Sequence, residues 1–150
     1  MLGITTLFLR ETAYGDLATE DAERTKAIRR CVPPFDCCGS IEVIFKPIDG
    51  VYLNNPQELI GKPWAYKLEI VAISRMDLIS CHTYCEFEFN GTQYATHAVH
   101  QKTRDPIFEF SCTLSTEKVE PAFLDYLLNG HITIAVFACA AGNLSGSKLW

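Results

Sequence analysis

An alternation of side chains with a period of two, between residues 66 and 72, constrains the fold of this chain more than any other feature. Successive side chains of an extended strand point to opposite faces, so this pattern places one apolar face on a core and the other in water. Gly61 and Pro63 come first; glycine permits unusual dihedrals, and proline biases its neighbour toward extended conformations. We therefore predict a half-buried strand whose core face consists of Tyr66, Leu68, Ile70 and Ala72.

The same alternation recurs along the chain and predicts an antiparallel sheet. The dipeptide Asn90-Gly91 separates two alternating segments, and it is a strong hairpin signal because both central positions of that turn need positive φ. Six short strands spaced by turn signals favour an all-β fold, specifically an antiparallel β-sandwich. The predicted strands cover residues 40–46, 66–72, 83–89, 93–99, 105–114 and 131–138.

Three segments carry helix signals instead. Residues 121–129 place proline early, apolar residues at helical spacing and Gly130 just past the end, which predicts a short inserted helix closed by a glycine cap. A single turn is expected after Asn55, where proline follows a cap residue. Residues 20–30, preceded by Thr19 as a cap, begin with acids and end with bases. That order complements the helix dipole and predicts a short N-terminal helical segment.

The length of 150 residues suits a single domain with a core of its own. We expect the sandwich at residues 39–138, with an N-terminal extension or linker at 1–38 and a C-terminal tail at 139–150. Residues 1–10 settle on no single period, so they are expected to form an edge strand or part of a truncated element.

Charge and cysteine usage narrow the class of protein. The net charge of -5 and the pI near 5.3 disfavour broad attraction to nucleic acid or to an anionic membrane surface, since both reward basic patches. The seven cysteines are odd in number, and the first residues lack a basic leading segment and a cleavage site. We therefore expect reduced thiols in a cytoplasmic protein.

Four segments then stand in a fixed order: NNPQELIGKPWAYKLEI at 54–70, TYCEFEF at 83–89, DPIFEF at 105–110, and VEPAFLDYL at 119–127 followed by HITIAVF at 131–137. Together they resemble the C2-like domain in the tail of kinesin-3 family motors, from about Asn54 to Ala138. Residues 39–43, GSIEV, resemble the strand that precedes that domain.

The resemblance implies a C2-like β-sandwich that serves as a non-catalytic binding module of a microtubule motor, in the cytoplasm and associated with the cytoskeleton. The implied partner is a cargo adaptor or another segment of the parent kinesin, and no nucleic acid. The chain departs from a complete kinesin, because Pro56 stands where an ATP-binding G-x-x-x-x-G-K-[ST] loop before Gly61-Lys62 would need its first glycine. It also lacks the heptads of the family's coiled coils.

No cofactor or metal is expected. A calcium-binding C2 domain needs several carboxylates from two loops, but the first loop offers Asp77 alone, and a turn cap explains Asp105. A zinc site is the alternative, but its ligands do not have zinc-ribbon spacing, and Cys85 continues a core stripe. The candidate zinc ligands would be Cys81, His82, Cys85, His97 and His100.

An enzyme is the rival class: a small cytosolic Cys/His hydrolase. No local signature marks any nucleophile and base as a pair, so structural thiols explain the cysteines better. The candidate nucleophiles would be Cys37, Cys38 and Cys81, and the candidate bases would be His82, His97, His100 and His131.

The loop after the organising strand is the candidate recognition site. Methionine and aliphatic side chains at a loop tip are costly to leave in water, so this loop is a candidate for binding a partner or a membrane lipid. A stand-alone calcium-independent phospholipid-binding protein is therefore a further alternative. In a competing interpretation, Leu78 and Ile79 fold back between the sheets. The candidate residues are Arg75, Met76, Leu78 and Ile79.

Overall fold

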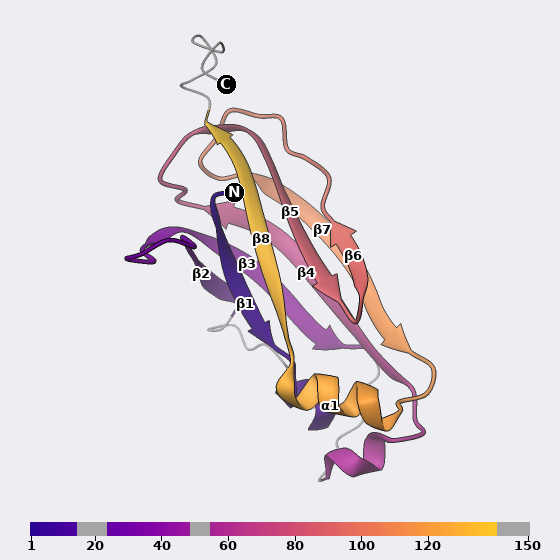
Figure 1. The fold of residues 1–150 in the computed structure, drawn as a ribbon. Helices are drawn as coiled ribbons and strands as arrows, with labels where there is room; N and C mark the ends of the chain where they lie inside the picture. Colours follow the sequence, from indigo (N-terminus) through magenta and orange to yellow (C-terminus); the bar gives the residue numbers. More distant parts are fainter. Residues whose placement is uncertain (15–23, 49–54, 141–150) are drawn as a thin grey trace.

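The computed structural model describes residues 1–14, 24–48 and 55–140, which form one curled, eight-stranded antiparallel sheet (Figure 1). The strand order is β6-β5-β8-β1-β2-β3-β4-β7. The strands are β1 (Gly3–Phe8), β2 (Thr25–Arg29), β3 (Cys37–Pro47), β4 (Trp64–Ser74), β5 (Ser80–Phe89), β6 (Thr92–Ala95), β7 (Ile107–Thr116) and β8 (His131–Ala140). The helical elements are the 3-10 turns η1 (Arg10–Tyr14) and η3 (Pro56–Leu59) and the helix α1 (Pro121–Asn129).

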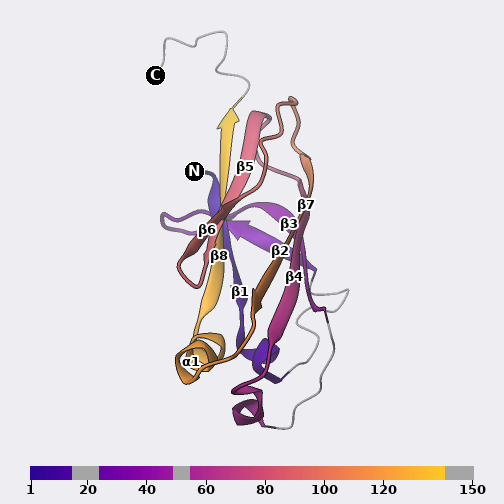
Figure 2. The ribbon, with the colours of Figure 1, turned by 90° about the vertical axis from the view of Figure 1, so that its right-hand side faces the viewer.

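The sheet curls until its two halves face each other. Figure 2 shows β5 and β8 on one side and β4 and β7 on the other. Side chains from the facing halves meet in the interior, where the rings of Phe87 and Phe110 lie 6.3 Å apart. The predicted all-β, antiparallel architecture is confirmed.

Trp64, at the start of β4, joins several elements in this core. Its ring stacks on Phe89 of β5 at 5.6 Å and meets Phe123 of α1 edge-on at 5.3 Å. Its Nε1 donates a hydrogen bond to the carbonyl oxygen of Thr12 in η1 at 3.3 Å. The N-terminal turn is therefore attached to the same core as the organising strand.

The helix predicted at residues 20–30 is wrong where the structure describes that segment. Residues 25–29 form β2, which pairs with β3 and contacts β1 at Arg29. The order of charges favours a helix locally, but Ile28 is fully buried only when the segment is extended between its two neighbours. Tertiary pairing thus overrides weak local propensity. The predicted cap, Thr19, and residues 20–23 lie outside the described residues.

β1 pairs with β8 along its whole length, and its other neighbour is β2. The segment 1–38 was expected to be an extension. It contributes two strands, β1 and β2, which lie in the middle of the strand order between β8 and β3. Residue 3 is a glycine because the two strands pack closely at this point. A Cβ at residue 3 would lie 2.5 Å from the carbonyl oxygen of Arg29.

The expected turn chemistry is largely confirmed. Asn55 caps η3 by accepting a hydrogen bond from the Gln57 amide at 3.0 Å. Asn90 and Gly91 both have positive φ, 48° and 84°, as the predicted hairpin turn requires. The return strand β6 ends at Ala95, four residues short of the predicted end.

Helix α1 occupies the predicted residues, and Gly130 is its C-cap as expected, with its amide donating a hydrogen bond to the Tyr126 carbonyl oxygen at 2.7 Å. Gly130 has a φ of −93°, which any residue can adopt. Glycine fits there for a steric reason, since a Cβ would lie 2.4 Å from the carbonyl oxygen of Tyr126.

Strands β6 and β7 are the two ends of the strand order among the described residues. β7 contains a bulge, where the register against β4 shifts between Ile70 and Ala72. Glu109 lies in this bulge with a φ of 50°, in the left-handed region.

Candidate functional site

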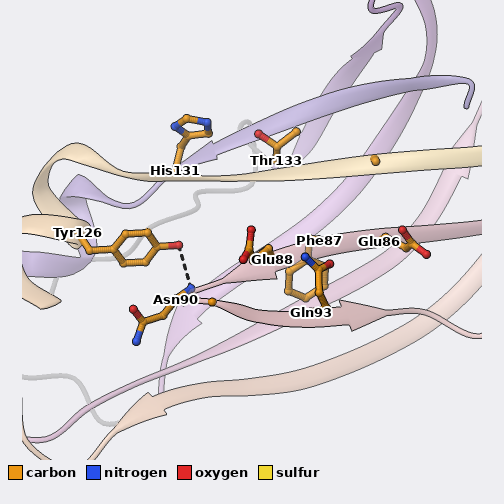
Figure 3. Close-up of a pocket in the computed structure, with 10 residues that line it drawn as sticks. Glu86, Phe87, Glu88, Asn90, Gln93, Tyr126, His131 and Thr133 are labelled. Carbon is orange, nitrogen blue, oxygen red and sulfur yellow. Dashed lines mark hydrogen bonds between the residues drawn. The ribbon is translucent and has the colours of Figure 1, made fainter.

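A groove of about 490 Å³ lies where the β5–β6 hairpin, β8 and α1 meet (Figure 3). Glu86 and Glu88 stand two residues apart on β5, so both side chains lie on the outer face of the sheet. His131 and Thr133 line the groove from β8. None of the groove's lining residues is an arginine or lysine.

In the part of the chain that the structure describes, no lysine or arginine pairs with either carboxylate. Neither Glu86 nor Glu88 forms an ion pair or a side-chain hydrogen bond among the residues that the structure describes. The cross-strand partner of Glu86 on β8 is Ala135, whose small side chain leaves the carboxylate accessible. The groove is therefore a site of negative potential that suits a cationic group.

Hydrogen bonding and ring packing hold the walls of the groove together. The Tyr126 hydroxyl of α1 accepts a hydrogen bond from the Asn90 amide of the hairpin turn at 3.2 Å. The Tyr126 ring also packs against Phe89 at 5.6 Å. Because the helix and the hairpin are joined in this way, the groove is formed before any partner arrives.

The predicted loop residues have divergent environments. Met76 is buried with 2% of its surface exposed, and Leu78 packs partly against the core. Arg75 is exposed, and 44% of Ile79 is exposed. The structure therefore leaves Arg75 and Ile79 at the surface and turns Met76 inward.

Backbone contacts hold this loop in place. The Arg75 amide donates to Asp105 Oδ1 at 2.9 Å, and the Asp77 amide donates to the Cys38 carbonyl oxygen at 3.1 Å. The Asp77 carboxylate forms an ion pair with Arg30. Both carboxylates considered for calcium thus already have structural partners.

The histidines considered as metal ligands pack against other rings. His82 and His100 lie 4.7 Å apart in an edge-on arrangement, and His97 packs on Phe108 at 6.3 Å. Within residues 1–14, 24–48 and 55–140, no group of three or more His, Cys, Asp or Glu side chains is placed to hold a metal ion.

A catalytic cysteine needs a lowered thiol pKa, whereas the pKa values of the buried cysteines in this chain are raised. Burial raises the pKa of the Cys85 thiol to about 12. The pKa of Cys38 is also raised, mainly by burial, although Arg30 opposes the effect. Cys37 is exposed, and its thiol donates to the carbonyl oxygen of Gly39 at 3.2 Å.

Sequence reasoning did not find the acidic groove. Its two glutamates were visible as the outward positions of a predicted strand, but the wall carrying Tyr126 comes much later in the chain. Only the packing of α1 beside the hairpin brings the two together.

Comparison with known proteins identifies no family for this chain. A scan against protein-family models found no match, and neither did a search of curated proteins. Among the described residues, no helix has the length and apolar character needed to cross a membrane.

Proposed function

We propose that this chain is a non-catalytic binding module of the kinesin-3 tail type, with a C2-like arrangement of its sheet. In this proposal it acts in the cytoplasm at the cytoskeleton. It binds a cargo adaptor or another segment of the parent kinesin.

A cluster of three rings is the observation that supports this assignment best. Trp64, Phe89 and Phe123 come from three separate segments that resemble the kinesin-3 domain. Their rings are in mutual contact, with centroids 5.3 to 6.1 Å apart. The segments that carry the resemblance therefore form one structural unit, which is what a shared fold requires.

The groove supports a binding role for this unit. It is preformed, lies on the outer face of the sheet and presents the carboxylates of Glu86 and Glu88, which form no ion pair within the described ranges. A basic segment of a protein partner would complement these charges. Arg75 and Ile79 provide a second exposed surface, in the loop between β4 and β5.

The identity of the parent protein can be tested directly. Sequencing the transcript upstream of the Met1 codon is expected to reveal an ATP-binding motor domain. A complete transcript that encodes no motor would refute the kinesin assignment but leave the binding role of the groove open.

The binding role needs a charge-reversal experiment. The variant Glu86→Lys with Glu88→Lys is expected to weaken binding to basic segments of the parent protein by about tenfold, because two exposed pairs contribute ~0.5–1 kcal/mol each. The matched control is Glu109→Lys with Glu117→Lys, which changes the net charge equally on exposed residues away from the groove. Fluorescence anisotropy measures both affinities at low salt. Equal losses in the two variants would show that only overall charge matters.

Lipid binding through the loop is the alternative to be tested in parallel. Ile79 is the exposed aliphatic residue of that loop. Cosedimentation with phosphatidylserine vesicles that is lost in Ile79→Asp, but kept in the Glu86/Glu88 variant, would favour the phospholipid-binding alternative over a protein partner.

A further inference from the structure

Two cysteines from different strands lie side by side where β5 pairs with the end of β8. Ser80 pairs with Ala140 and His82 pairs with Cys139, so Cys81 is an extra residue in a bulge of β5. In such a bulge, two consecutive residues of one strand oppose a single residue of its partner. Cys81 and His82 therefore both face Cys139.

The side chains agree with this register. The two thiols are close enough for Cys81 to perturb the pKa of Cys139. Both residues are half-buried, so small oxidants and reductants can reach them. The pKa of Cys139 is raised by partial burial and then by Cys81, as expected for two thiols that share one site.

The other cysteines do not offer an equivalent pair. Cys37 and Cys38 are consecutive on β3, and their side chains point to opposite faces, one exposed and one buried. Cys85 is enclosed in the core. Cys31 is exposed, and Cys112 lies half-buried on β7, at one end of the strand order.

We propose that Cys81 and Cys139 form a reversible disulfide that fastens β5 to the end of β8 under oxidising conditions. The oxidant is a peroxide. One thiol loses its proton, and the thiolate attacks the peroxide to give a sulfenic acid and a hydroxide ion, which takes up that proton as water. The second thiol then attacks the sulfenic sulfur, and its proton leaves with the sulfenic hydroxyl as a second water. Overall, two thiols and one hydrogen peroxide give one disulfide and two waters. A dithiol reductant reverses the reaction by exchange.

The bridge lies at the base of the candidate recognition loop, because Cys81 follows Ile79 by two residues. Ser80, between them, also exchanges two backbone hydrogen bonds with Thr103. Oxidation would therefore restrain the point where this loop enters β5 and would fix the last residues of β8. This device is independent of whether the acidic groove binds a basic partner.

Peptide mapping of the full chain tests the proposal. Reduced protein is treated with hydrogen peroxide, blocked with N-ethylmaleimide and digested with trypsin without reduction. The expected product joins the peptide of residues 76–102 to that of residues 119–148, with fragmentation placing the bond at Cys81. The Cys85→Ala variant removes the second cysteine of the first peptide and should give the same product.

Two controls separate a fold-directed bridge from random oxidation. Cys81→Ser and Cys139→Ser should each abolish the linked peptide, whereas Cys37→Ser should retain it. In 8 M urea, a denaturing concentration, the preference for this pair should disappear. The oxidised protein should melt roughly 5–10 °C higher than the reduced protein, and dithiothreitol should reverse the shift. Peroxide-treated protein in which both thiols still react fully with N-ethylmaleimide, or a bridge to another cysteine, would overturn the proposal.

Discussion

Replacing Trp64 with phenylalanine should lower the free energy of unfolding by about 2–4 kcal/mol. The variant keeps an aromatic ring between β4, β5 and α1 but removes the indole N–H that binds the Thr12 carbonyl oxygen. Leaving that buried carbonyl unpaired costs ~1–3 kcal/mol. The smaller ring leaves a void of roughly 40 Å³, which adds ~1 kcal/mol. Trp64→Ala, which also loses the ring contacts with Tyr66, Phe89 and Phe123, should cost ~3–5 kcal/mol.

Urea unfolding followed by far-UV circular dichroism measures this effect without relying on tryptophan fluorescence. The control Ile107→Thr changes an exposed side chain on β7 and should stay within ~0.5 kcal/mol of the parent. If Trp64→Phe unfolds at the parent's urea midpoint with an unchanged m-value, the Thr12 bond does not stabilise the fold. The inference that η1 belongs to the core would then fail.

Three further predictions concern the fold. A fragment of residues 39–138 should show no cooperative unfolding transition by circular dichroism, because it lacks β1 and β2; a cooperative transition would show that the first two strands are dispensable. Gly130→Ala should cost ~1–3 kcal/mol in urea unfolding, because its Cβ would overlap the Tyr126 carbonyl oxygen; an unchanged midpoint would contradict the close packing. Burial raises the pKa of Cys85 to about 12 and that of Cys112 to about 11, against 9.0 for an ordinary thiol. From pH 9 to 12 the unfolded chain releases these thiol protons while the folded chain keeps them. The free energy of unfolding is therefore highest below pH 9 and decreases as the pH rises above 9. Urea midpoints at pH 8 and 10 measure the slope, which should be shallower in Cys85→Ala.

The organising strand and the β5–β6 hairpin could be predicted because their local signals agree with their packing. In β4, alternate residues are buried over most of the strand, and Asn90-Gly91 adopts the positive φ angles that its residue types favour. In these segments the local sequence preference and the tertiary packing favour the same structure. The strands could therefore be predicted from the sequence alone.

β1 and β2 could not be predicted with equal success, since their buried faces are not uniformly apolar. In β1 the inward positions are Gly3, Thr5 and Leu7, while Phe8 is exposed. In β2 only Ile28 is buried, so the charge order of a helix was the stronger local signal. These strands depend on neighbours that are distant in the sequence.

The candidate site, too, could be predicted from the sequence only in part. The loop of residues 75–79 was visible as an apolar tip, but the inward direction of Met76 follows from the bonds that hold the loop to Asp105 and Cys38. The acidic groove requires α1 to pack beside the hairpin. No spacing within one segment encodes that arrangement.

The bulge at Glu109 also bears on how this molecule behaves at high concentration. A long, regular outer strand is a template onto which a second molecule can add its own strand and start a fibril. The left-handed residue in β7 interrupts that template, and its charge adds repulsion between copies. The bulge in β7 therefore disfavours the addition of a second molecule's strand at this end of the sheet, where a regular strand would favour it.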